Sequence, residues 1–277
     1  MQEKISTIGP LENRLLSWSQ MTGRQCVTTA LIADSLRIPS GRVSRLFDRM
    51  ARGGLALQLQ RGLYLLPEKL PPGGRWQPPV ELAVWHYLQA KQASWQETGA
   101  AAFNHYGLSE QLANIATVYN DKVSGQRSFG KLVVVFIKVK NARLGNAIEV
   151  ELAPNRPERR KIGTLARVVT DAVDDYSRFG TLPKAYRWIW GRREDSVFLK
   201  ELAGCALRYG NVASRRRIGW LLEKGAVKPK IWAPLKKSLR PSTAFIPLDP
   251  TRPAKGRTDR TWGVVENLEL KGLDYAK

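Results

Sequence analysis

Apolar residues recur at helical spacing at the amino-terminal end of the chain. In residues 10–21, Leu11, Leu15 and Trp18 follow one another at i, i+4 and i+7, a spacing typical of one face of an amphipathic helix. Pro10 suits the first turn of a helix, where a missing backbone N–H costs little. The pattern therefore predicts a helix over residues 10–21.

Two further helices are predicted after it. Thr28 or Thr29 can cap a helix that includes residues 31–36, because a hydroxyl at the helix start accepts a bond from a free backbone N–H. Ser40 is well placed to cap a third helix over residues 41–52, and two glycines follow that segment. Glycine after a helix favours its termination.

An antiparallel hairpin is predicted directly after the third helix. Residues 55–60 alternate between leucine and other side chains, with the period of two that a half-buried strand requires. Arg61 and Gly62 offer a turn, and residues 63–66 can pair back as a second strand. Three helices followed by a hairpin is the order of a winged helix-turn-helix, predicted here over residues 1–70.

The prolines in the next stretch indicate a linker over residues 71–79 and a second domain over 80–277. In that domain helices are expected over 80–93 and 100–105, and residues 132–137 have the pattern of a buried strand. Further helices are expected over 164–176, 196–209 and 213–224, a strand over 147–152 as neighbour of 132–137, and loops with short strands over 228–260 that finish at 261–265. The fold class is therefore α+β, with an amino-terminal winged helix and a larger mixed α/β carboxy-terminal domain.

The charge balance indicates a polyanionic partner. Among 277 residues there are 45 Lys and Arg against 24 Asp and Glu, a formal net charge of +21. Cations that neutralise phosphates release condensed counterions, which favours nucleic acid. The amino-terminal sequence lacks the apolar stretch of a signal peptide and no apolar run is long enough to cross a membrane, so a cytoplasmic protein with no membrane partner is expected.

The predicted third helix has two distinct faces. At about 100° per residue, its apolar side chains fall on one arc and its arginines on another. Arginine can contact a guanine edge or a phosphate with two donors at once. The DNA-contacting residues proposed from this helix and the hairpin tip are Ser40, Gly41, Arg42, Ser44, Arg45, Arg49, Arg52 and Arg61. The alternative is a small helical subdomain with a solvated, arginine-rich face.

A second basic surface is proposed in the carboxy-terminal domain. Residues 214–260 carry much of the excess positive charge, and the candidates are Arg215, Arg216, Arg217, Lys236 and Lys237. The three consecutive arginines cannot all face one way, since neighbours on a helix diverge by about 100°. The alternative is a solvated helix in which one arginine forms a structural ion pair, with contact to phosphate or to a partner protein as the other possibility.

Few residues favour catalysis or metal binding. His86 lies between two aromatic residues and is expected to be a packed or hydrogen-bonded core histidine. Glu149 and Glu151, which alternate on a strand, and the pair Asp174–Asp175 are interpreted as surface carboxylates. Cys26 and Cys205 are far apart and are expected to be reduced thiols. No catalytic residue, metal site or cofactor is therefore predicted.

Several motifs resemble those of the AbiEi antitoxins of bacterial type IV toxin–antitoxin systems. The winged-helix part of the resemblance runs from Ile32–Leu36 through Val43 and Leu46–Phe47 to Arg61–Tyr64. The remaining motifs are Thr164–Ala172, the Arg-Arg-apolar-Gly-aromatic-Leu-Leu-Glu helix within Asn211–Glu223, and Thr261–Val265.

The resemblance implies an antitoxin that represses its own operon. Such a protein binds inverted repeats in double-stranded DNA, where a dimer is possible, and counters a nucleotidyltransferase-like toxin with or without binding it directly. The function expected from the sequence is sequence-specific repression of a toxin–antitoxin or phage-defence operon. The alternatives are a structural or assembly protein that binds nucleic acid nonspecifically, and a nuclease.

Overall fold

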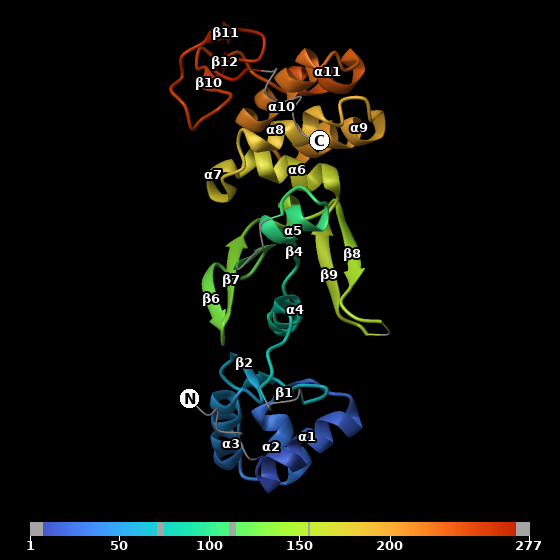
Figure 1. Cartoon of the computed structure of the whole chain (residues 1–277), viewed down its shortest axis with the longest axis vertical. Coiled ribbons are helices and arrows are strands. Elements are labelled where there is room, and N and C mark those ends of the chain that lie inside the picture. Colours follow the sequence, from blue (N-terminus) through green and yellow to red (C-terminus); the bar gives the residue numbers. More distant parts are fainter. Residues whose placement is uncertain (1–7, 71–74, 111–114, 155, 270–277) are drawn as a thin grey trace. The chain divides into compact units, whose positions relative to one another are not determined.

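The computed structural model describes residues 8–70, 75–110, 115–154 and 156–269. The chain is mixed α+β, as predicted (Figure 1), and divides into two compact units, each formed by separate stretches of sequence. Unit 1 consists of Met1–Ala93, Ser124–Phe136 and Glu151–Arg160, and unit 2 of Ser94–Val123, Ile137–Val150 and Lys161–Lys277. Of the predicted linker, residues 71–74 lie outside the described residues.

Three helices open unit 1 at the positions that the pattern predicts: α1 (Pro10–Thr22), α2 (Thr29–Leu36) and α3 (Ser40–Gly53). The Thr28 hydroxyl caps α2 by accepting a bond of 3.1 Å from the backbone N–H of Leu31. After α3, Gly54 adopts a left-handed conformation with φ 72°, which glycine does at little cost.

The predicted cap of α3 is wrong by one residue. Pro39 occupies the cap position with φ −56° and ψ 135°, and Ser40 is the first residue of the helix. The carbonyl of Pro39 accepts the backbone N–H groups of Arg42 and Val43 at 2.8 and 3.2 Å. Proline fixes an extended backbone just before the helix, so α3 begins without a side-chain cap.

A three-stranded antiparallel sheet accompanies these helices (Figure 1). It consists of β1 (Cys26–Thr28), β2 (Leu57–Gln60) and β3 (Leu63–Leu65), in the order β1-β3-β2. The hairpin β2–β3 turns at Arg61–Gly62, where Gly62 has φ 78°. The backbone N–H of Thr29 donates to the carbonyl of Gly62 at 3.1 Å, so the turn lies against the start of α2.

The apolar face of α3 forms much of the core around these elements. Its four buried side chains are Val43, Leu46, Phe47 and Met50, each at most 1% exposed. The ring of Phe47 stacks on that of Tyr64 in β3, with centroids 4.2 Å apart. This packing joins α3 to the sheet, and it fixes which side of the helix remains in contact with solvent.

The rest of unit 1 comes from later in the chain. Helix α4 (Val80–Ala90) precedes an antiparallel hairpin of β6 (Gly125–Phe129) and β7 (Leu132–Lys138). The ring of Tyr87 lies 5.2 Å from Phe129 and 5.3 Å from Phe136. Compactness therefore places residues 80–93, which the sequence analysis put in the second domain, with the amino-terminal helices.

Unit 2 contains a sheet with β5-β4-β9-β8 as consecutive neighbours. These strands are β4 (Trp95–Thr98), β5 (Ile115–Asn120), β8 (Ala147–Glu151) and β9 (Arg159–Gly163). Strand β4 pairs antiparallel with β5 and parallel with β9. The predicted pairing of the 147–152 strand with 132–137 is wrong, because β8 pairs with β9, the next strand along the chain.

The helices of unit 2 include the expected ones together with several shorter ones. They are α5 (Ala100–His105), η1 (Asn141–Arg143), α6 (Leu165–Asp174), α7 (Tyr176–Phe179), α8 (Lys184–Trp190), α9 (Ser196–Tyr209), α10 (Val212–Lys224) and α11 (Pro229–Lys237). Helix α11 corrects the prediction of loops and short strands over 228–260. It begins with Pro229 in its first turn, contains Pro234 within it, and buries Ile231 and Leu235.

A small sheet closes the described part of unit 2. It contains β10 (Ile246–Pro247), β11 (Arg257–Asp259) and β12 (Val264–Glu266), in the order β10-β12-β11. Trp262, just before β12, is 1% exposed and packs directly on α10. A Cβ atom at Gly219 of that helix would lie 2.1 Å from the Trp262 ring, so only glycine allows this approach.

Candidate nucleic-acid interface

The solvent side of α3 carries the arginines that the sequence singled out. Arg42, Arg45, Arg49 and Arg52 are all exposed, and they are spaced i, i+3, i+7 and i+10 along the helix. At about 100° per residue this spacing places them within roughly a quarter of the helix circumference. Because the opposite face is locked in the core, the arginine face is held in one orientation relative to α2 and the sheet.

Two of these guanidinium groups are held by their own helix. Nε of Arg45 donates to the Gly41 carbonyl at 3.4 Å, and Nε of Arg52 donates to the Asp48 carbonyl at 3.2 Å. Both bonds leave the terminal nitrogens of the fork available to another acceptor. The face therefore presents donors in a partly fixed geometry, as recognition of phosphates or base edges requires.

Arg49 differs from its neighbours because it has an acidic partner. Its Nε lies 2.5 Å from Oε1 of Glu12 in α1, and the carboxylate is 7% exposed while the arginine is 59% exposed. Glu12 could not be recognised from local sequence patterns, because its partner lies 37 residues further along the chain. The ion pair connects α1 to α3 and partly neutralises this position.

The other proposed contact residues lie at the ends of the same elements. Ser40, Gly41 and Ser44 are exposed in the first half of α3, beside Arg42 and Arg45. Arg61 is exposed at the tip of the β2–β3 hairpin rather than on α3. All eight residues belong to unit 1, and all are accessible to solvent.

The three consecutive arginines of α10 are placed differently. Arg215 donates to the carbonyls of Ala206 and Leu207 at 3.3 and 2.9 Å. Arg216 and Arg217 are only 7% and 4% exposed. Two of the three arginines proposed for a second basic surface are therefore buried, which corrects that part of the prediction.

Each buried arginine has a backbone acceptor. Nη1 of Arg216 donates to the Ala244 carbonyl at 2.9 Å. Arg217 donates twice to the Pro247 carbonyl, at 3.1 and 3.3 Å, and its guanidinium lies 4.8 Å from the ring of Tyr176. These two side chains therefore fasten α10 to the segment that leads into and forms β10. Of the proposed second surface, Lys236 and Lys237 at the end of α11 are exposed.

Polar side chains form a buried network in unit 2 that the sequence analysis missed. Arg167 and Asp171 of α6 are almost fully buried and pair at 3.0 Å, and the Arg167 guanidinium lies 3.8 Å from the ring of Tyr209. Burial raises the pKa of Asp171 to about 6, although Arg167 opposes the shift. Their spacing of i and i+4 was the available signal, but it did not indicate burial.

Asp174 also belongs to this network, which corrects its interpretation as a surface carboxylate. Its side chain is 4% exposed and lies 2.9 Å from Nη2 of Arg143. The same carboxylate accepts bonds from the Asn211 backbone N–H and the Ser214 hydroxyl at 2.7 and 2.5 Å. It therefore holds the start of α10 against the end of α6.

Glu149 and Glu151 lie where the sequence analysis expected them. They are 59% and 57% exposed and pair with Lys161 at 3.3 Å and Arg159 at 2.9 Å across the β8–β9 strands. Within the described ranges, no group of three or more His, Cys, Asp and Glu side chains is arranged to hold a metal ion.

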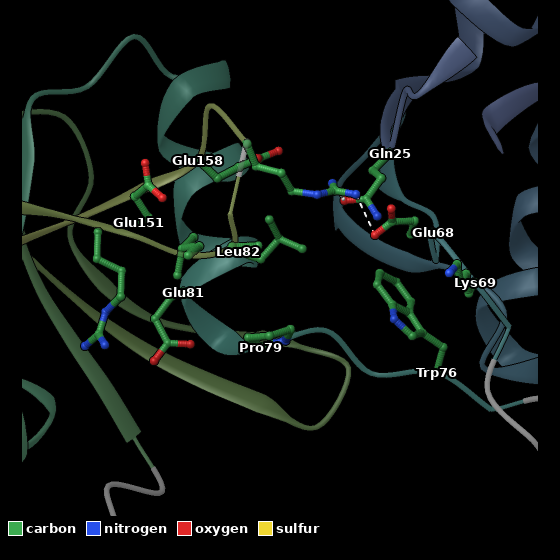
Figure 2. A pocket seen from close by; sticks show the side chains of 13 residues that line it. Gln25, Glu68, Lys69, Trp76, Pro79, Glu81, Leu82, Glu151 and Glu158 are labelled. Carbon is green, nitrogen blue, oxygen red and sulfur yellow. Dashed lines mark hydrogen bonds and ion pairs between the residues drawn. The ribbon is translucent and has the colours of Figure 1, made fainter. Parts of the chain in front are cut away.

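Unit 1 contains a cavity of about 580 Å³, lined by residues from its amino-terminal part and from the 151–160 segment (Figure 2). Arg156 lies along it, with Nη1 3.0 Å from Oε1 of Gln25 and Nη2 2.5 Å from Oε2 of Glu68. Trp76 and Leu82 form apolar parts of its wall. Arg156 thus joins the amino-terminal elements to the 151–160 segment within the same unit.

His86 contacts one wall residue of this cavity. Its Nε2 lies 3.4 Å from Oε1 of the buried Glu158. Burial lowers the pKa of His86, and the nearby Glu158 carboxylate only partly offsets that shift. The position agrees with the expected core histidine.

Comparison with known proteins extends the description of the fold. No protein-family model and no curated protein sequence matches the chain. The crystal structure of the RV2827C protein from Mycobacterium tuberculosis is similar to it, with a TM-score of 0.64 and 16% sequence identity. The match covers 95% of this chain and 93% of that one. At this level of identity the similarity concerns the fold alone.

Among the helices of the described residues, none is both long and apolar enough to cross a bilayer.

Proposed function

We propose that the chain is a sequence-specific DNA-binding protein whose first three helices and hairpin act as a winged helix-turn-helix. The observation that carries the proposal is the exposed arginine face of α3, opposite a face that is fully buried. In helix-turn-helix proteins the second helix of the motif enters the major groove with its amino-terminal residues toward the bases. Here that helix is α3, and Ser40, Gly41, Arg42, Ser44 and Arg45 occupy its first turns.

Arg45 is assigned to base contact and Arg52 to backbone contact. Arg45 is in the first half of α3, where the helix is closest to the groove floor in this docking mode. Arg49 and Arg52 lie further along, and Arg49 is already paired with Glu12. Arg61 at the hairpin tip reaches a flanking phosphate or the minor groove.

The cellular role that we propose is repression of a toxin–antitoxin or phage-defence operon in the cytoplasm. Its support is the resemblance of the α2–α3 and hairpin residues, and of the α10 sequence, to AbiEi antitoxins. An inverted-repeat operator would recruit two copies, since each half-site takes one winged helix. A nucleotidyltransferase-like toxin is the proposed second partner.

The test starts from the full-length protein and a pool of random-sequence duplexes. Selection should enrich one sequence, and Arg45→Ala should then weaken binding to it by about 1–3 kcal/mol, with a smaller loss on random duplex. Arg178→Ala, an exposed arginine of α7, serves as the control for charge loss. Absence of enrichment, or equal loss on both duplexes, would contradict base recognition by Arg45.

The competing proposal is nonspecific nucleic-acid binding through the carboxy-terminal part of the chain. The exposed lysines at the end of α11 favour it, because lysine contacts phosphates without reading sequence. It predicts equal affinity for selected and random duplexes at a fixed salt concentration. It also predicts that Lys236→Gln/Lys237→Gln lowers DNA affinity more than Arg45→Ala does.

A further inference from the structure

Unit 2 contains a small cavity whose charged wall residues are all cations. Its volume is about 220 Å³, and its charged lining residues are Arg216, Lys236, Arg240 and Arg260. Ser242 and Thr261 add hydroxyl groups, and no carboxylate lines it. A cavity below the usual size of a drug-sized ligand site, lined by four cations and no carboxylate, suits a single small anionic group.

The deepest of these cations is Arg216. It reaches the cavity from α10, is 7% exposed, and uses Nη1 to donate to the Ala244 carbonyl at 2.9 Å. Gly263 packs against the guanidinium, since a Cβ at that position would lie 3.1 Å from Nη1. The charge is therefore held in place by backbone on one side and by a hydrogen bond on another.

Arg216 has a backbone acceptor but, in the described part of the chain, no acidic partner. Among the described residues no carboxylate lies within 4.0 Å of it. The acidic groups of this region are engaged elsewhere: Glu223 accepts a bond of 2.7 Å from Trp262 Nε1, and Asp259 accepts a bond of 3.2 Å from the Trp262 backbone. Arg216 therefore lines the cavity with a positive charge that no carboxylate of the described residues neutralises.

The wall around Arg216 is rigid on its apolar side. Trp262 is 1% exposed, packs on α10 at Gly219, and lies edge-on to Trp232 with ring centroids 6.0 Å apart. The exposed cations Lys236, Arg240 and Arg260 surround the opening. A ligand entering from solvent thus meets three exposed cations before it reaches the buried Arg216.

We propose that this cavity is a phosphate-binding site, with Arg216 at its base and Lys236, Arg240 and Arg260 around it. Phosphate oxygens accept hydrogen bonds from guanidinium and hydroxyl groups, which are the groups that line this cavity. The phosphate is that of a nucleic-acid backbone or a free phosphate group. The first case rests on the proposed function, because it enlarges the DNA contact of α3 with a second point of attachment.

The experiment uses the full-length protein and inorganic phosphate as the first probe. Calorimetric titration should show saturable binding to the native chain, and Arg240→Gln/Arg260→Gln should weaken it at least about tenfold. The matched control is Lys230→Gln/Lys255→Gln, which removes two exposed charges from the same region outside the cavity. No saturable binding, or equal loss in both double variants, would overturn the proposal.

A second arm identifies the source of the phosphate. For a duplex, the slope of log affinity against log salt should become shallower by about 0.9 for each lost phosphate contact. A shallower slope in the cavity variant alone supports a backbone phosphate. Loss of inorganic phosphate binding with an unchanged slope supports a free phosphate group as ligand. If the chain binds no DNA, the phosphate titration still tests the site, so the two proposals fail separately.

Discussion

Helices α3 and α10 are both rich in arginine, but they use it in opposite ways. In α3 the arginines follow i, i+3, i+7 spacing and share one exposed face, while four apolar side chains fill the other. In α10 three arginines are consecutive, so they point in three directions and find three sets of backbone acceptors. The spacing of the arginines, more than their number, therefore decides whether they share one exposed face or hold the backbone of neighbouring segments.

The buried arginines of unit 2 should therefore control stability. The strongest case is Arg167→Ala, which leaves Asp171 buried without its partner, and breaking such a pair costs about 3–5 kcal/mol of unfolding free energy. Urea denaturation at neutral pH measures the loss. Arg45→Ala on α3 should change the same quantity by less than about 0.5 kcal/mol.

A double variant separates the effect of charge from that of packing. Arg167→Leu/Asp171→Leu removes both charges, so it should recover much of the unfolding free energy that Arg167→Ala loses. If Arg167→Ala and Arg45→Ala had equal effects on stability, the contrast between the two regions would not hold.

The same pair predicts a pH dependence. Because burial raises the pKa of Asp171 from 3.8 to about 6, the folded state holds this proton more tightly than the unfolded state. The protonated Asp171 carboxyl therefore contributes at most about 3 kcal/mol to the free energy of unfolding. This contribution is complete below about pH 4 and is lost as the pH rises to about 6. The free energy of unfolding, measured by denaturation at several pH values between about 4 and 6, should fall with pH more steeply for the native chain than for Asp171→Asn. An identical pH dependence in the two proteins would contradict a raised pKa of Asp171.

Arg217→Ala sharpens the comparison between α10 and α3. It removes two hydrogen bonds to the Pro247 carbonyl and the contact with Tyr176. We expect a loss of about 1.5–3 kcal/mol, as is typical of hydrogen bonds to charged groups. Arg42→Ala is the control on α3, and a larger loss of stability there would reverse the interpretation.

The smallest effect on stability is expected at Arg49, which lies on the exposed face of α3 and also forms an ion pair with Glu12. Glu12→Gln removes its ion pair, and because Arg49 is largely exposed the stability should fall by only about 0.2–1 kcal/mol. The released arginine should make the salt dependence of DNA binding steeper by up to about 0.9 in slope. An unchanged slope would mean that Arg49 does not contact phosphate.

The sequence predicted α1, α2, α3 and the hairpin because their signals are local: helical spacing, a threonine cap, and glycines after a helix or in a turn. It missed β1, which has only three residues and exists through its pairing with β3. It also missed α11, because Pro234 lies inside that helix and proline normally disfavours such a position. The apolar residues Ile231 and Leu235, spaced i and i+4, were the sequence signal in favour of a helix, and both are buried in the structure.

The candidate interface could be predicted more fully than the phosphate cavity. The arginine face of α3 is set by residues within one helix, so periodicity reveals it. The cavity instead brings together Arg216 of α10, Lys236 near the end of α11, and Arg240 and Arg260 from two later loops. Charge density alone had identified this region, but it could not show that Arg216 is buried or that Arg240 and Arg260 lie beside it.

The discontinuity of unit 1 has a consequence for synthesis of the chain. Its three stretches end at Ala93, Phe136 and Arg160. Residue 160 must therefore emerge from the ribosome before all parts of unit 1 can pack together. Tyr87 lacks the rings of Phe129 and Phe136 until residue 136 has emerged, and Gln25 and Glu68 lack Arg156 until residue 156 has emerged. Nascent chains that stop between residues 93 and 160 should therefore expose apolar surface, and would be the preferred targets of chaperones and proteases.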